Sequence, residues 1–113
     1  MHEMSLCEGM VQILEEQARV QNYRRVKQVW LEVGALAGVE VAALRFCFDV
    51  VCRGTLAEGA ILHVLETPGR GWCMACSRAV VVERRFDPCP ECGSHQVQVT
   101  GSEEMRIKEL EVE

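Results

Sequence analysis

The sequence has no apolar run close to the roughly 20 residues that a membrane-spanning helix needs. We also expect no secretory leader, because Met1-His2-Glu3 is followed by an amphipathic pattern with acidic residues and not by a basic start and an apolar segment. We therefore expect a cytoplasmic protein with no membrane role. Its 49% hydrophobic and 26% charged residues are typical of a globular domain.

An excess of positive charge is also missing. The chain has 12 basic and 17 acidic residues, which gives a formal charge of −5. Nucleic-acid binding draws much of its affinity from phosphate contacts by Lys and Arg. Residues 70–95 contain four arginines against three acidic residues, and four thiolates around a divalent ion would add two negative charges. We therefore expect no nucleic-acid partner.

The cysteine count is seven, so the even number typical of a secreted disulfide framework is absent. Four of the cysteines form two Cys-x-x-Cys pairs that are separated by twelve residues: Cys73, Cys76, Cys89 and Cys92. Four thiolates are the ligand set of a closed, tetrahedral structural zinc site. The spacing predicts a zinc ribbon with Zn(II) as a structural cofactor. Disulfides and a thioredoxin-type redox pair are the weaker alternatives, since a redox pair needs one exposed Cys-x-x-Cys that opens a helix after a strand.

Hydrophobic periodicity predicts the elements around this ribbon. Apolar residues recur at helical spacing over 5–21, with Glu3 or Ser5 as cap, and over 40–52. Strand patterns occupy 25–33, 60–66 and 105–112. Within the ribbon we expect strands at 80–86 and 97–99, flanked by linkers at 68–71 and 101–102.

These elements predict an α+β fold with two helices on a three-stranded sheet and an inserted zinc-ribbon module. The expected domains are a first domain of residues 1–67 and 103–113 and a ribbon module of residues 68–102.

The amino terminus is a candidate second metal site. The α-amine of Met1, the backbone and ring nitrogens of His2, and a donor from Glu3 can form fused chelate rings, and square-planar nitrogen and oxygen ligation suits Ni(II) or Cu(II). Alternatively, His2 is a solvated residue near a frayed terminus. Glu40 is expected to be a surface carboxylate at a helix start, which gains interest only if the two helix starts lie side by side.

The other histidines and cysteines have ordinary interpretations. His63 lies in a strand and is expected to be packed or hydrogen-bonded. His95 lies three residues beyond Cys92 and is expected to be an outer neighbour of the zinc site, with a spare ligand as the alternative. The three cysteines outside the ribbon are expected to act chiefly as small buried hydrophobes: Cys7, Cys47 and Cys52.

A set of motifs spread over the whole chain resembles the HypA/HybF family of hydrogenase maturation proteins. These motifs are Met1-His2-Glu3, Ser5-Leu6-Cys7, Val29-Trp30-Leu31-Glu32-Val33-Gly34, Phe46-Cys47-Phe48-Asp49-Val50-Val51-Cys52-Arg53-Gly54 and the two Cys-x-x-Cys pairs. The resemblance implies nickel binding at Met1, His2 and Glu3, a nearby carboxylate at Glu40, and structural zinc on the four ribbon cysteines. It also implies two partners, a maturation GTPase and the large subunit of nickel-iron hydrogenase, or in some organisms urease. Some family members have a histidine directly after the ribbon cysteines, whereas Ser77 and Gly93 stand there in this chain.

The leading hypothesis is therefore a nickel metallochaperone, not an enzyme, that binds Ni(II) at its amino terminus and delivers it to the hydrogenase large subunit. The rival is a zinc-ribbon module that binds a protein or a nucleic acid and has no nickel role. A third hypothesis, an enzyme with a reactive thiol, requires a cysteine of low pKa with a base nearby, and no such pairing is evident in the sequence.

Overall fold

The computed structural model describes residues 2–113, which fall into two compact units. The first unit comprises the chain up to Leu31 together with Val39–Leu65 and Arg106–Glu113. The second comprises Glu32–Gly38 and Glu66–Met105. The elements in chain order are α1 (Glu3–Gln21), β1 (Val26–Gly34), α2 (Val41–Cys52), β2 (Ile61–Thr67), β3 (Gly69–Cys73), β4 (Arg78–Val82), β5 (Val97–Gly101) and β6 (Met105–Val112).

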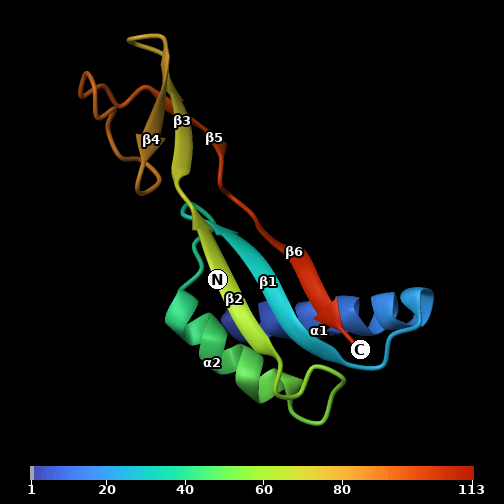
Figure 1. Ribbon diagram of the computed structural model, residues 1–113. Helices are drawn as coiled ribbons and strands as arrows, with labels where there is room; N and C mark the ends of the chain where they lie inside the picture. Colours follow the sequence, from blue (N-terminus) through green and yellow to red (C-terminus); the bar gives the residue numbers. More distant parts are fainter. Residues whose placement is uncertain (1) are drawn as a thin grey trace. The chain divides into compact units, whose positions relative to one another are not determined.

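The first unit contains both helices, which pack against each other and against one face of a sheet (Figure 1). The strand order of this sheet is β2-β1-β6, so the strand that follows the ribbon pairs with β1, far earlier in the chain. Alternate residues of β1 are buried, among them Val29 and Leu31, and Leu14 of α1 and Leu44 of α2 complete the core. The predicted α+β fold, two helices on a three-stranded sheet, is confirmed.

Helix α1 begins two residues earlier than its periodicity indicates. Its N-cap is His2 in an extended conformation, with no side-chain capping bond, so the prediction of Ser5 or Glu3 as cap is wrong. At its other end Asn22 takes a left-handed conformation and Tyr23 Oη donates to the Leu14 carbonyl at 2.7 Å. Since left-handed backbone is a frequent helix stop, Asn22 ends the helix where expected.

The second unit is built on another three-stranded sheet, of order β4-β3-β5. Its central strand β3 lies where the sequence predicts a linker, and that prediction is wrong. The Pro-Gly-Arg-Gly composition resembles a loop, but the glycines serve close packing. A Cβ on Gly69 would lie 2.1 Å from the Val82 carbonyl oxygen, and one on Gly71 would lie 2.8 Å from Val97 Cγ1.

Strand β4 is also shorter than the predicted 80–86. After Val82 the chain turns, with the Arg84 N–H donating to Asp87 Oδ2 at 3.1 Å and Phe86 at φ 70°. A small core fills the inner side of this sheet: Leu36, Cys73, Val80, Val82 and Cys89, with Cys76, Val97 and Val99 at its edge.

Within residues 2–113, neither helix combines the length and the apolar character needed to cross a bilayer.

Candidate metal centres

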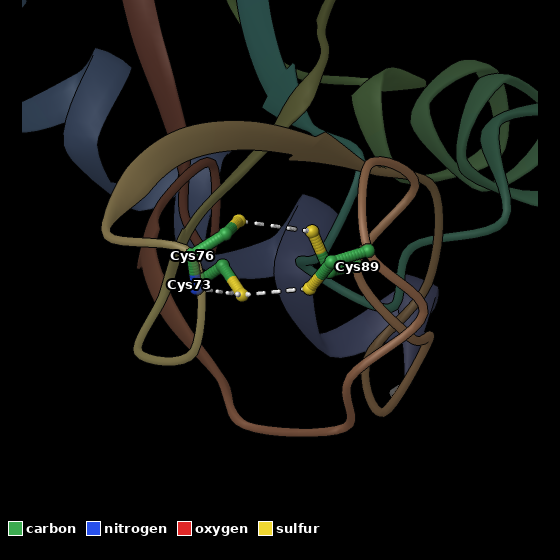
Figure 2. Close-up of side chains that lie close together, drawn as sticks. Cys73, Cys76 and Cys89 are labelled. Atoms are coloured by element: carbon green, nitrogen blue, oxygen red, sulfur yellow. Dashed lines mark hydrogen bonds between the residues drawn. The ribbon is translucent and has the colours of Figure 1, made fainter.

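The four ribbon cysteines lie together. Their Sγ atoms are all within 4.8 Å of one another, and Figure 2 shows the sulfurs of Cys73, Cys76 and Cys89 turned towards a common space. The Sγ–Sγ distances are 3.6 Å between Cys73 and Cys92 and 3.8 Å between Cys76 and Cys89. Since Zn–S bonds are about 2.3 Å, the edge of a ZnS₄ tetrahedron is about 3.8 Å. The cluster therefore has the size of a tetrahedral thiolate site and not of a disulfide, whose S–S bond is about 2.05 Å.

Each Cys-x-x-Cys segment forms the same kind of turn. The Ser77 N–H donates to the Cys73 carbonyl at 2.9 Å, and the Gly93 N–H donates to the Cys89 carbonyl at 2.8 Å. Both residues have positive φ, 53° for Ser77 and 76° for Gly93. The matched turns place two sulfurs from each half of the ribbon opposite one another.

Backbone N–H groups also point at the sulfurs. The N–H groups of Cys76 and Glu91 donate to the Sγ atoms of Cys73 and Cys89, both at 3.4 Å. The bond from Cys76 lowers the pKa of the Cys73 thiol to about 7, and desolvation raises that of Cys76 to about 12. Hydrogen bonds to sulfur favour the thiolate, which is the form that binds a metal. The sequence predicts the four sulfurs but not these two donors, which arise only from the turn geometry.

The proposed nickel residues that the structure describes meet at the starts of the two helices. Glu3 lies in the first turn of α1, and its Oε2 accepts a hydrogen bond from the Glu40 N–H at 3.2 Å. Glu40 is the N-cap of α2, where its Oε1 accepts from the Ala42 N–H at 3.2 Å. A backbone N–H and a carboxylate that are 37 positions apart in the chain thus join the starts of the two helices. Met1 lies outside the described residues.

His2 directly precedes these carboxylates. Its backbone carbonyl accepts from the Leu6 N–H at 3.2 Å, while its exposed side chain makes no capping bond. The hydrogen bond from the Glu40 N–H lowers the pKa of the Glu3 carboxyl. The starts of the two helices therefore carry three groups. The His2 imidazole is exposed, the Glu3 carboxylate is hydrogen-bonded to the N-cap residue of α2, and the Glu40 carboxylate is exposed.

The remaining cysteines and histidines do not gather into another ligand set within residues 2–113. Cys7 and Cys52 are buried, and desolvation raises their pKa values to about 12 and about 11, whereas Cys47 is half-buried. Cys7 and Cys52 are thus protonated near neutral pH, opposite to what a nucleophilic thiol requires.

His63 is packed and hydrogen-bonded, as predicted. Its ring stacks on Trp30 with centroids 4.7 Å apart, and its Nε2 lies 2.6 Å from Gln28 Oε1. His95 is exposed.

Comparison with known proteins gives a consistent result. A family model described as hydrogenase/urease nickel incorporation, metallochaperone, HypA matches residues 1–112. The chain is 59% identical over 113 residues to the hydrogenase maturation factor HypA of Azotobacter vinelandii and 61% identical to that of Alkalilimnicola ehrlichii, with 100% of each chain covered. It also matches the solution structure of the Ni metallochaperone HypA from Helicobacter pylori with a TM-score of 0.71 at 24% identity, over 99% of this chain and 97% of that one. The structural likeness supports the fold.

Proposed function

Because the chain belongs to the HypA family of nickel-incorporation metallochaperones for hydrogenase maturation, we propose that it binds Ni(II) at its amino terminus and delivers it to the large subunit of nickel-iron hydrogenase. The observation that supports this most is the hydrogen bond from the Glu40 backbone N–H to the carboxylate of Glu3, which directly follows the exposed His2. Nickel is the cargo of this protein, which catalyses no reaction of its own. It acts in the cytoplasm together with a maturation GTPase.

The proposed nickel ligands come from the first three residues. The Met1 amine, the nitrogens of His2 and a donor from Glu3 supply the nitrogen and oxygen set that Ni(II) prefers. The Glu40 carboxylate adds negative charge at the same place, which offsets the unfavourable position of a cation at a helix N-terminus. Since the amine and the imidazole bind only without their protons, acidification weakens binding and favours release.

Nickel titration of variants tests this assignment. We expect His2→Ala, or a chain with residues added before Met1, to bind Ni(II) at least about tenfold more weakly, because an amine or a ring ligand is lost. The matched control is His95→Ala, which removes another exposed histidine in the second unit and leaves affinity unchanged. Unchanged affinity in His2→Ala would instead favour the rival function, a zinc-ribbon interaction module without nickel.

We propose in addition that Zn(II) is held by Cys73, Cys76, Cys89 and Cys92 as a structural ion. The sulfur distances match a tetrahedral site, and bound zinc supplies folding free energy to a module too small to bury a large core. Functionally, residues 68–102 form the zinc module, and residues 1–67 with 103–113 form the nickel-binding domain.

Replacing one ligand tests the zinc site. We expect Cys92→Ser to lose stoichiometric zinc and the fold of the ribbon, as measured by metal analysis and by the emission of Trp72. Cys47→Ser, a half-buried cysteine outside the cluster, keeps one zinc per chain. Full zinc occupancy in Cys92→Ser would contradict ligation by four sulfurs.

A further inference from the structure

A row of polar side chains crosses the sheet of the first unit on the face away from the helices. The helices cover the other face, where alternate residues such as Leu31 and Leu62 are buried (Figure 1). On the open face His63 Nε2 lies 2.6 Å from Gln28 Oε1, and Gln28 Nε2 donates to Glu111 Oε2 at 2.8 Å. Since these residues belong to β2, β1 and β6, one row of hydrogen bonds spans all three strands. These three side chains are called the His63 relay below.

The His63 relay has one possible polarity. An ionised carboxylate only accepts hydrogen bonds, so the Gln28 amide directs its NH₂ group to Glu111 and its oxygen to the ring of His63. The ring nitrogen that faces this oxygen, Nε2, therefore carries a hydrogen, and Nδ1 keeps its lone pair. A proton that His63 takes up enters at Nδ1 and leaves every hydrogen bond of the relay in place.

Protonation of His63 strengthens its contacts with β1. The bond to Gln28 becomes charge-assisted, and such bonds are roughly twice as strong as neutral ones. The ring also stacks on Trp30, with centroids 4.7 Å apart and planes inclined by 11°, which is within the range of a cation–π contact. At the far end of the relay, the Glu111 carboxylate attracts the added charge through the polarised amide. All three contributions have the same sign.

The charged groups around His63 favour the protonated ring. Strand alternation places two further carboxylates on the face of the relay, one on β1 and one on β6, while the other residues that β2 presents there are uncharged. On the side of the helices, an arginine of α2 donates to the backbone carbonyl of Leu62 at 2.7 Å. These groups are Glu32 of β1, Glu109 and Glu111 of β6, and Arg45 of α2. Three negative charges thus outweigh one positive charge.

We infer that the His63 relay is a proton-sensitive clamp, in which uptake of a proton by His63 tightens the connection of β2 and β6 to β1. Histidine is the side chain that ordinarily changes charge between pH 5 and pH 8, where carboxylates ordinarily stay ionised, so the clamp tightens as the pH falls through this range. Along the chain β2 leads into the second unit and β6 returns from it. Acidification therefore has opposite effects in the two places: it weakens the proposed nickel site and tightens the sheet. The clamp itself does not depend on the proposed function.

The emission of Trp30 reports the charge of His63. In a Trp72→Phe variant of the full-length, zinc-loaded and nickel-free chain, Trp30 is the only tryptophan. An imidazolium quenches a stacked indole more strongly than a neutral imidazole does, so we expect the emission to fall between pH 8 and pH 5. His63→Gln should abolish this change. The matched control His95→Ala, which removes an exposed histidine of the second unit, should retain it.

Glu111→Gln tests whether charge passes along the relay. The variant keeps an acceptor for Gln28 and removes only the carboxylate charge. We expect the midpoint of the quenching to move to lower pH by about 0.3–0.5 unit, as for a screened charge at the end of two hydrogen bonds. The matched control is Glu16→Gln, an exposed carboxylate of α1 on the other face of the sheet, which should leave the midpoint in place. Equal shifts in the two variants would reflect net charge alone and would refute the relay.

Urea unfolding tests whether the proton tightens the fold. A midpoint shift of about 0.4 pH unit corresponds to a factor of about 2.5 in the unfolding constant. In a double-mutant cycle of His63→Gln and Glu111→Gln we therefore expect a coupling of about two- to threefold at pH 5.5 and a smaller one at pH 8. A coupling that does not grow on acidification would contradict the clamp.

Nitrogen NMR of the isotope-labelled, unmodified chain gives a readout that needs no variant with an altered relay. At pH 8 the protonated ring nitrogen of His63 should be Nε2, because only this tautomer fits the polarity of the relay. A His63 ring protonated at Nδ1, an emission of Trp30 that is constant from pH 8 to pH 5, or an unaltered midpoint in Glu111→Gln would each overturn the inference.

Discussion

Ser77 and Gly93 occupy the same position in the two cysteine turns, and both have left-handed backbone. This conformation costs a residue with a Cβ about 1–2 kcal/mol relative to right-handed backbone, whereas glycine adopts it readily. The first turn therefore carries strain that the second avoids.

We expect Ser77→Gly to stabilise the zinc-loaded protein by about 0.5–1 kcal/mol, because the strain relieved exceeds the extra entropy that glycine gives the unfolded chain. Gly93→Ser should destabilise it by a similar amount or more. Guanidinium unfolding followed by Trp72 emission in a Trp30→Phe background measures both. A stabilising Gly93→Ser variant would mean that the two turns are not equivalent.

Glu3 links the starts of α1 and α2, and its lowered pKa makes that link dependent on pH. A carboxyl whose pKa is lower in the folded than in the unfolded state stabilises the fold above the unfolded value, and the effect is lost as pH falls through the folded value. The ordinary value is 4.5. The stabilisation is thus fully present at pH 7 and decreases once the pH falls below about 4.5.

Replacement of Glu3 by Gln keeps a neutral acceptor for the Glu40 N–H and removes only the charge. We expect the wild-type protein to be more stable than Glu3→Gln at pH 7 and the difference to disappear in strong acid. Urea unfolding from pH 3 to pH 7, followed by helical circular dichroism without nickel, measures the difference. A difference that does not vary with pH would show that the charge of Glu3 contributes nothing.

Among the elements, β1 and β3 end or begin at glycines that permit close backbone contacts. A Cβ on Gly34, at the end of β1, would lie 2.1 Å from the Ser102 carbonyl oxygen, and Ser102 is itself at φ 62°. Gly9, inside α1, has nothing within 4 Å of its Cβ position. The two glycines therefore predict opposite effects of the same substitution.

We expect Gly34→Ala to destabilise the protein by about 1–3 kcal/mol, because backbone atoms must move to admit the methyl group. Gly9→Ala, the matched control, should stabilise it by about 0.5–1 kcal/mol through helix propensity. Thermal unfolding of both variants measures the two signs. An unchanged thermal stability of Gly34→Ala would show that the backbone at Ser102 moves away from the added methyl group without a loss of free energy.

Prediction from sequence works for elements in which the spacing of apolar side chains follows the buried face. The 3.6-residue pattern of α1 and α2 and the alternation of β1 are each produced by one buried face. The sequence also predicts β6 with its observed limits, Met105–Val112. The sequence does not predict strand β3, because two of its inward positions are glycines, whose role is to make room and which carry no hydrophobic signal.

Of the two candidate sites, one follows from the spacing of residues in the sequence and the other depends on packing. The two Cys-x-x-Cys pairs carry their spacing in the chain, so the sulfur cluster follows directly from the sequence. The hydrogen bond from the Glu40 N–H to Glu3 depends on how two helices pack, which one sequence does not specify.

For the whole molecule, both helices belong to the first unit and all four ribbon cysteines to the second. We therefore expect removal of zinc by a strong chelator to leave helical circular dichroism largely intact, while in a Trp30→Phe background the emission of Trp72, which is 41% exposed in the folded ribbon, shifts further towards that of a fully exposed indole. Measuring nickel affinity before and after chelation tests whether the two sites communicate. Loss of helical signal together with zinc would show that the units fold as one.

The insertion of the ribbon between β2 and β6 has a consequence for the entropy of the chain. Without zinc, the sheet of the first unit is closed by a flexible loop of about 37 residues, counted from Thr67 to Met105. Loop-closure entropy grows only with the logarithm of length, at about 0.6 kcal/mol for each doubling, so such a loop costs on the order of 3 kcal/mol. In this sheet β1 pairs with β2 on one side and with β6 on the other, and this pairing offsets the free energy of closing the loop. The first unit can therefore form before the ribbon has bound its metal.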